Sequence, residues 1–319
     1  MSTLTRAQTA EWLLSRDGFL ILTHLRPDGD TVGCAAALCR ALREQGKRAF
    51  ILNDPGTSAI YTPYLEGLLA PADFVPDTVA AVDVAAANLL TDEARPYLDR
   101  IDLVIDHHPS QTFYGANTCV DAGCAACGEL VYDVVRLWGE VSASVALPLY
   151  VAVSTDTGCF VYGNTTPNTH RVAAALMDTG IDVTPVNHRH FRTKSAKRLK
   201  IEGMLVAGMQ VYDGGTLAVV TLTLAMMDAV GAGEEDVDNI SALVGEIEGV
   251  HTGVTVRQLT PTQCKVSLRT RPEELNASDV CALLGGGGHA AAAGLTMDAS
   301  PEETARAVLD AIRTIQNRK

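Results

Sequence analysis

The chain has 319 residues, of which 47% are hydrophobic and 20% are charged, the composition of a soluble globular protein. This length favours two domains, and no apolar run reaches the roughly 20 residues that a membrane helix needs. The formal net charge of −13 argues against binding of long nucleic acid through a basic surface, because such binding relies on many Lys and Arg contacts to phosphate. A short anionic ligand is compatible with this charge, since the local field matters more than the total.

Apolar runs with strand character alternate with helical segments in the first half of the chain. Strands are predicted at residues 19–24, 48–52, 79–84 and 101–106, and helices at 30–45, 128–138 and 167–177. A further apolar run, 146–153, is taken as a strand that ends just before Asp156. This alternation predicts an α/β fold whose first domain, residues 1–185, has a parallel sheet with helices on both faces.

The second half contains a basic segment and a smaller domain. Residues 188–200 hold six Lys or Arg and no acid, which is typical of a solvated linker helix, here predicted at 186–205. The same residues can also form a positive wall over a phosphate-binding cleft, and the two interpretations are compatible. Residues 206–319, where strand-like and helical runs alternate, predict a mixed α/β domain.

The amino terminus lacks the basic and apolar segments of a signal peptide, so we expect a cytoplasmic protein. The eight cysteines lie in apolar and Ala-rich segments without the spacing of a disulfide scaffold, which favours reduced thiols. Cys124 and Cys127, with Cys119 nearby, have the spacing of half a zinc site. No second pair of ligands at matching spacing follows, so we do not expect structural zinc.

Acidic and histidine side chains follow several of the predicted strands. The candidates are His24, Asp28, Asp30, Asp83, His107, His108 and Asp156. Ligands bind at the carboxyl ends of the strands in open α/β sheets, so these side chains are expected to converge there. Two divalent cations that share a bridging carboxylate need such a set of ligands. Gly29, between Asp28 and Asp30, is expected to permit a tight turn.

These motifs resemble a known family. His24 to Asp30, Asp83, Asp106-His107-His108 and Asp156 are similar in type and order to the four motifs of the DHH phosphoesterase superfamily. Gly285 to Gly294 resembles the glycine-rich loop of the DHH-associated substrate domain, and Ser267 to Thr270 resembles its arginine-bearing strand. The layout is most similar to the nanoRNase branch, which degrades very short RNA and dephosphorylates 3′-phosphoadenosine 5′-phosphate (pAp).

The resemblance implies a two-manganese centre, with Mg²⁺ or Co²⁺ as substitutes. His24, Asp28 and Asp83 would hold one ion, and Asp30, Asp83, His107 and Asp156 the other, with Asp83 bridging. Asp106 would orient a histidine, and His108 would face the scissile phosphate and stabilise developing charge. A mixed set of imidazole and carboxylate ligands suits manganese, and it is not the thiolate set typical of a zinc–thiolate site.

The carboxyl-terminal domain is expected to bind an anionic part of the substrate. The predicted contacts are Arg269, Gly286, Gly287, Gly288 and His289, with Arg192 of the basic segment. A glycine-rich loop lets backbone N–H groups approach an anion closely, and arginine can bind phosphate through two hydrogen bonds. An Ala-rich helix is expected to start after His289.

The leading hypothesis is a manganese-dependent phosphoesterase that hydrolyses short oligoribonucleotides to 5′-mononucleotides, in the 3′-to-5′ or the 5′-to-3′ direction, and pAp to AMP and phosphate. The expected partners are short RNA or small nucleotides. We expect no binding to membranes or to long nucleic acid, and the family implies a homodimer. One alternative is hydrolysis of cyclic or linear dinucleotides. Another is a pyrophosphatase or polyphosphatase, which would cluster Lys and Arg in the second domain. The third is a nucleotide-binding regulator without catalysis.

Overall fold

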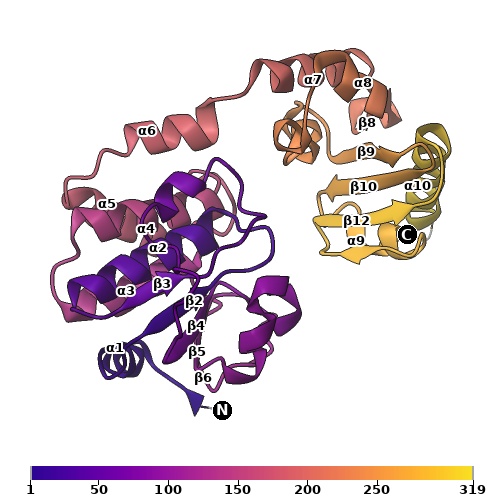
Figure 1. Ribbon diagram of the computed structural model, residues 1–319. Coiled ribbons are helices and arrows are strands. Elements are labelled where there is room, and N and C mark those ends of the chain that lie inside the picture. Colours follow the sequence, from indigo (N-terminus) through magenta and orange to yellow (C-terminus); the bar gives the residue numbers. More distant parts are fainter. Residues whose placement is uncertain (1, 318–319) are drawn as a thin grey trace. The chain divides into compact units, whose positions relative to one another are not determined.

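The computed structural model describes residues 2–317 and divides the chain into two compact units between Thr193 and Lys194 (Figure 1). The boundaries expected from the sequence, residues 185 and 205, lie on either side of this division. No helix among the described residues is long and apolar enough to cross a membrane.

The first unit contains a six-stranded sheet in which every pairing is parallel. The strands, in spatial order, are β1 (Ser2–Thr3), β6 (Asn117–Val120), β5 (Leu103–Asp106), β4 (Thr78–Val82), β2 (Phe19–Leu22) and β3 (Ala49–Ile51). The central strands β2, β4 and β5 are buried along their whole length, as expected for a parallel sheet covered on both faces. The predicted α/β class with a parallel sheet is confirmed.

Different kinds of helix cover the two faces of this sheet. On one face, Ile21, Val82 and Ile105 share a core with the long helices (Figure 1). Those helices are α1 (Arg6–Leu14), α2 (Gly29–Glu44), α3 (Cys127–Val135), α4 (Ala143–Asp156) and α5 (Pro167–Asp178). On the other face, Leu20 and Val104 pack with Ala94 of the 3-10 helix η3 (Asp92–Arg100). Shorter helical segments are η1 (Thr62–Leu65), η2 (Ala87–Leu89), η4 (Arg136–Trp138), α6 (Thr184–Asn187) and the π-helix η5 (His188–Arg192).

The apolar run 146–153 is the main departure from the expected elements. It lies in helix α4, so the prediction of a strand before Asp156 was wrong. The run is apolar on every side because α4 packs among other helices, and such a sequence has no polar face that would reveal the helical period. A Cβ at Gly33 of α2 would lie 2.3 Å from the carbonyl oxygen of Pro148, so only glycine allows the two backbones to approach this closely.

The second unit is a mixed α/β unit built on a six-stranded sheet. In spatial order the strands are β11 (Gly287–Gly288), β12 (Ala292–Met297), β10 (Gln263–Thr270), β9 (Thr252–Thr260), β8 (Leu217–Leu222) and β7 (Gln210–Tyr212). Only β8 and β9 pair in parallel among these described strands. Alternate residues of β8 face two cores, Val219 towards one and Val220 towards the other.

Helices lie on both faces of this second sheet. The core around Val219 includes α9 (Ala277–Ala282) and α10 (Pro301–Gln316), and the core around Val220 includes α7 (Ala196–Ala207), α8 (Leu224–Val230), η7 (Glu234–Val237) and η8 (Ile240–Glu246). The remaining short segment is η6 (Asp213–Gly215). The Ala-rich segment after His289 forms β12, so the expected helix start was wrong. Pairing with β10, from Arg269–Ala292 to Cys264–Met297, overrides the local helix preference of alanine.

Candidate metal centre

Three loops that follow neighbouring strands supply candidate ligands from the sheet. His24 follows β2, Asp83 follows β4, and His107 and His108 follow β5. Asp83 has φ 57°, a left-handed conformation that costs a non-glycine residue about 1 kcal/mol or more. Its backbone N–H donates to Ile105 O at 2.8 Å, which fixes this turn beside β5. The fold thus holds Asp83 in a strained position between the other two loops.

Two helices bring the remaining carboxylates to the same edge. Asp28 caps α2, because its Oδ1 accepts from the backbone N–H groups of Asp30 and Thr31. Gly29 is the first residue of α2 and has no positive φ, so it does not serve the expected tight turn. Its role is close approach, because a Cβ there would lie 2.2 Å from Thr155 Oγ1. This contact places the end of α4, with Asp156, against the start of α2.

The structure brings all six predicted metal ligands together in two groups that share Asp83. In the first group, His24 Nε2 lies 3.5 Å from Asp28 Oδ1 and 3.9 Å from Asp83 Oδ2. In the second, His107 Nε2 lies 3.6 Å from Asp83 Oδ1. The same nitrogen is 3.7 Å from Asp30 Oδ2 and 3.6 Å from Asp156 Oδ2. Each oxygen of Asp83 therefore faces a different group, which is the arrangement of a carboxylate that can bridge two cations.

Hydrogen bonds to the backbone fix the orientation of two imidazoles. His24 Nδ1 lies 3.0 Å from Leu25 O, and His107 Nδ1 lies 3.1 Å from Cys124 O. A carbonyl oxygen can only accept, so Nδ1 carries the proton in both rings. Nε2 of each ring is then the atom that faces the carboxylates, and it can bind a metal once it has lost its proton.

The electrostatics of the cluster favour bound cations. Burial raises the pKa of Asp83 and of Asp30 well above the usual range, and neighbouring carboxylates raise both further. Burial opposes protonation of His24, yet the hydrogen bond that its ring donates to Asp28 raises its pKa to about 9. Asp83 Oδ1 is buried and has no hydrogen-bond partner among residues 2–317. Buried carboxylates that repel one another, with an orphaned oxygen at the centre, fit divalent cations as their missing partners.

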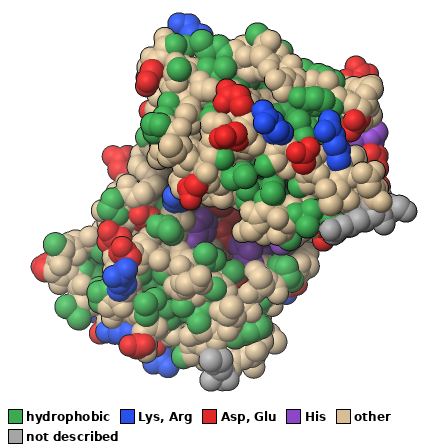
Figure 2. All heavy atoms as spheres, turned by 90° about the vertical axis from the view of Figure 1, so that its right-hand side faces the viewer, with side chains coloured by type: hydrophobic (Ala, Val, Ile, Leu, Met, Phe, Trp, Pro, Cys, Tyr) green, Lys and Arg blue, Asp and Glu red, His purple; other side chains and the backbone are tan. Residues whose placement is uncertain are grey.

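His108 and Asp106 form a pair beside these groups. His108 Nδ1 lies 2.8 Å from Asp106 Oδ1 and 3.5 Å from Asp83 Oδ1. The hydrogen bond to Asp106 raises the pKa of His108, and its side chain is 41% exposed. Figure 2 shows histidine and acidic side chains next to one another at the surface of the molecule. The free Nε2 of His108 is therefore available to a ligand.

Sequence reasoning missed one side chain that orders this pair. Gln111 is buried, and its amide donates to Asp106 Oδ2 at 2.6 Å and to Val84 O at 2.9 Å. Its Oε1 accepts from the N–H of Phe113 at 2.9 Å. Because nothing in the sequence marks these contacts, only the folded loop reveals that Gln111 holds Asp106 in place.

The predicted anion-binding residues of the second unit lie at neighbouring positions of its sheet. Arg269 on β10 pairs with Ala292 of β12, and Gly288 pairs with Ala293. The N–H of Gly286 donates to Cys281 O and that of His289 to Ala292 O, so these two amides are already paired. Arg269 Nη2 lies 3.4 Å from Ser241 Oγ, and His289 is exposed. Arg192 is exposed on η5 of the first unit.

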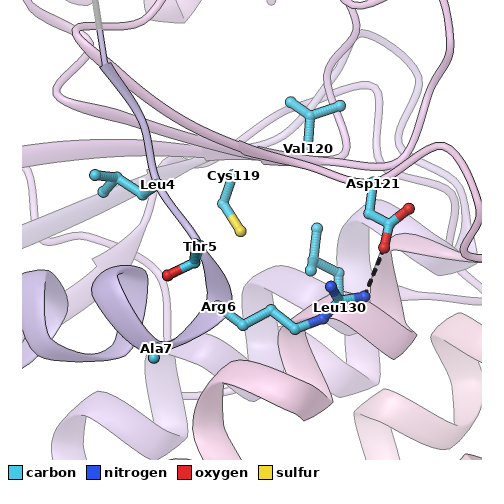
Figure 3. Close-up of a pocket in the computed structure, with 8 residues that line it drawn as sticks. All are labelled: Leu4, Thr5, Arg6, Ala7, Cys119, Val120, Asp121 and Leu130. Carbon is cyan, nitrogen blue, oxygen red and sulfur yellow. Dashed lines mark hydrogen bonds and ion pairs between the residues drawn. The ribbon is translucent and has the colours of Figure 1, made fainter.

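A pocket of about 340 Å³ lies elsewhere in the first unit, where α1 begins beside β6 (Figure 3). Arg6 reaches across it to Asp121, with 2.7 Å between Nη2 and Oδ2, and its Nε lies 2.9 Å from Asp133 Oδ2. None of the candidate metal ligands lines this pocket. Its charges are paired with one another, so it offers an ion-paired surface and no cation site.

Comparisons with known proteins place the chain in a family. The model of the DHH family N-terminal domain matches residues 18–153, and that of the DHHA1 domain matches residues 215–317. A bifunctional oligoribonuclease and PAP phosphatase of Thermus thermophilus is 34% identical over 310 residues, which cover 95% of this chain and 92% of that protein. The chain belongs to the DHH family.

Two further matches cover most of the chain. A bifunctional oligoribonuclease and PAP phosphatase of Bacillus subtilis is 24% identical over 287 residues, or 88% of this chain and 90% of that protein. The crystal structure of an exopolyphosphatase-related protein from Bacteroides fragilis superimposes with a TM-score of 0.87 at 22% identity and covers 98% of this chain and 96% of that one. This likeness supports the fold.

Proposed function

We propose that the protein is a two-metal phosphoesterase that hydrolyses short oligoribonucleotides to 5′-mononucleotides and pAp to AMP and phosphate. The single observation that carries the proposal is Asp83, whose two buried oxygens face His24 and His107 respectively. The names of the Thermus and Bacillus relatives supply the substrate class. The geometry supports two-metal hydrolysis, and the family match directs it to phosphoesters.

The distances support the ligand sets that the resemblance implies. His24, Asp28 and Asp83 would hold one cation, and Asp30, Asp83, His107 and Asp156 the other. Paired divalent cations supply Lewis-acid charge to a phosphoryl group and lower the pKa of a water molecule. We propose Mn²⁺ because the ligands are imidazoles and carboxylates without a thiolate, with Mg²⁺ or Co²⁺ as substitutes.

His108 is the proposed catalytic residue. Asp106 holds its Nδ1–H, so Nε2 points away from the pair and can meet a phosphate oxygen. The raised pKa of His108 favours the protonated ring, which stabilises negative charge as it develops on that oxygen. In the reaction the oxygen of water bonds to phosphorus, the P–O bond to the leaving group breaks, and the leaving oxygen takes up a proton.

The second unit is proposed to bind an anionic group of the substrate through Arg269, the loop Gly286–Gly288 and His289. Arg192, on η5 of the first unit, is retained as a separate proposed contact to the substrate. Arginine and an exposed histidine beside a glycine strand can bind phosphate oxygens. A cytoplasmic location and a homodimer, both expected from the sequence, are retained as part of this proposal.

The test is a substrate panel with matched variants. Initial rates and products are measured with Mn²⁺ on RNA of two to five nucleotides, single-stranded DNA, pAp, cyclic di-AMP and pyrophosphate. We expect the wild type to favour short RNA and pAp and Asp83→Asn to lose at least about a hundredfold in rate. Asp121→Asn, which alters the acid paired with Arg6, is the control and should keep its rate. Equal turnover by wild type and Asp83→Asn would refute this active site, and preference for cyclic di-AMP or pyrophosphate would refute the substrate class.

A further inference from the structure

Three donors surround the carboxylate of Asp30. Its Oδ1 accepts from the N–H of Gly128 at 2.9 Å and from the Sγ–H of Cys34 at 3.2 Å. Its Oδ2 accepts from the N–H of Cys127 at 2.6 Å. The side chain of Asp30 is only 1% exposed, so these protein groups provide hydrogen bonds where water is excluded. Asp28, by contrast, has a side chain that is 56% exposed.

The positions of these donors follow from helix geometry. Cys34 comes four residues after Asp30 on α2, so both side chains lie on the same face of that helix. Cys127 and Gly128 are the first two residues of α3, whose amides have no acceptor within the helix. Ala126, at the cap position of α3, makes no side-chain capping bond. The carboxylate of Asp30, 97 residues away in sequence, caps α3 in its place.

The bonds also distinguish the two oxygens of Asp30. A carboxylate oxygen has two lone pairs, and both lone pairs of Oδ1 are engaged by Gly128 and Cys34. Oδ2 has a single donor and keeps one lone pair. This oxygen is also the one that lies 3.7 Å from His107 Nε2. Oδ2 is therefore the atom of Asp30 that can bind a cation.

We propose that Cys34 is a positioning residue for the metal centre. Together with the start of α3, Cys34 engages Oδ1 of Asp30 and so would direct Oδ2 at the second cation. This inference rests on the proposed function, because it assumes that the cluster of Asp30, His107 and Asp156 binds a cation. The thiol of Cys127 donates to Ile105 O at 3.4 Å and also neighbours the thiol of Cys34. Partners that orient a metal ligand typically change metal affinity about 10- to 100-fold when they are removed.

Helix α2 supplies a matched control. Cys39 lies on the same helix and is also fully buried, but its thiol donates to Ala49 O at 3.2 Å and contacts no metal ligand. Cys34→Ala and Cys39→Ala therefore remove the same atoms from the same helix, while only the first removes a bond to Asp30. Cys34→Ser retains a donor, and Cys34→Val fills the space without one.

The experiment measures Mn²⁺ binding to the full-length variants by titration calorimetry and by the paramagnetic resonance signal of free Mn²⁺, with thermal unfolding of the metal-free proteins alongside. We expect Cys34→Ala and Cys34→Val to bind one of two Mn²⁺ ions about tenfold or more weakly, and Cys34→Ser and Cys39→Ala to keep wild-type affinity. The second donor-free variant keeps the test decisive if Cys34→Ala fails to fold.

The possible failures are distinguishable. Wild-type affinity in Cys34→Ala or Cys34→Val would overturn the positioning role and leave the proposed function standing. The same role is overturned if Cys39→Ala weakens Mn²⁺ binding as much as Cys34→Ala, because the loss would then come from packing. A wild-type protein that binds no divalent cation would instead overturn the proposed function itself, and this inference with it.

Discussion

Gly29 of α2 lies directly against Thr155 of α4, with room for no side chain at residue 29. Gly29→Ala is therefore expected to push the two helices apart and to separate Asp28 and Asp30 from Asp156. We expect a loss of about 1–3 kcal/mol in the free energy of unfolding, the usual cost of overpacking, together with weaker Mn²⁺ binding. Chemical denaturation and calorimetry of the variant measure the two effects.

Gly203→Ala is the matched control, because Gly203 lies within α7 and, apart from its chain neighbours and the adjacent helix backbone, no atom of the described residues is within 4 Å of the position that its Cβ would take. Here alanine should stabilise by about 0.5–1 kcal/mol through helix propensity and leave Mn²⁺ binding unchanged. If Gly29→Ala behaved like Gly203→Ala, close approach of α2 and α4 would not be what assembles the site.

Gln111 provides a prediction about Asp106 and His108. Gln111→Glu keeps the shape of the side chain but replaces the amide that donates to Asp106 Oδ2 and Val84 O with acceptor oxygens. We expect about 1–3 kcal/mol of destabilisation from the unpaired buried groups and a lower kcat on an RNA dimer with little change in KM, because His108 loses its fixed partner.

The control for this substitution is Gln263→Glu, where the same type of amide donates to Asp298 Oδ1 at 2.7 Å on the exposed surface of the second unit. That variant should keep its kcat and nearly all its stability. If Gln111→Glu raised KM and left kcat unchanged, the residue would serve substrate binding and not the Asp106–His108 pair.

The contact made by His190 with two tyrosines leads to a prediction about pH and stability. His190 Nε2 lies 2.9 Å from Tyr64 Oη, and its ring stacks on Tyr61 at 5.4 Å. Burial and the neighbouring charge of Arg189 lower the pKa of His190 from 6.5 to about 4. The unfolded chain thus binds more protons at this residue between pH 6.5 and 4, and the stability that neutral His190 contributes is lost as the pH falls through this window.

The free energy of unfolding should therefore fall less between pH 7 and 4 in His190→Gln than in the wild type. Both proteins are measured in a chelator that removes metal. His188→Gln, on the same π-helix but exposed, should follow the wild-type curve. Identical pH dependence in all three proteins would mean that His190 is as easily protonated in the folded state as in the unfolded chain.

The sequence predicted where the candidate ligands of the parallel sheet lie because each of them follows a strand that is buried on both faces. The apolar runs before His24, Asp83 and His107 could be recognised without tertiary information. The element before Asp156 could not, because an apolar run of this length fits a buried helix as well as a buried strand.

The residues that support the ligands were not predictable for a different reason. The bond from Cys34 to Asp30 is local in sequence. Its orienting effect, however, depends on helix α3, which begins at the same carboxylate 97 residues later. Gln111 likewise acts through a loop conformation that no periodic pattern encodes. Orienting contacts of this kind depend on where separate elements meet, which the strand and helix patterns do not specify.

Asp83→Asn should change the stability of the protein in opposite directions with and without metal. In the metal-free protein, Asp83 is buried among carboxylates that raise its pKa, so a neutral isostere relieves repulsion and should stabilise by about 0.5–2 kcal/mol. With Mn²⁺ at about a hundred times its dissociation constant, the free energy of unfolding of the wild type rises by about 2.7 kcal/mol. The variant lacks the shared ligand and should gain little of this. Thermal unfolding in chelator and in Mn²⁺ should show the two melting curves exchange order, whereas Asp310→Asn on the exposed surface of α10 should shift little in either condition. Equal stabilisation of wild type and Asp83→Asn by Mn²⁺ would show that the cations, if bound, do not share Asp83.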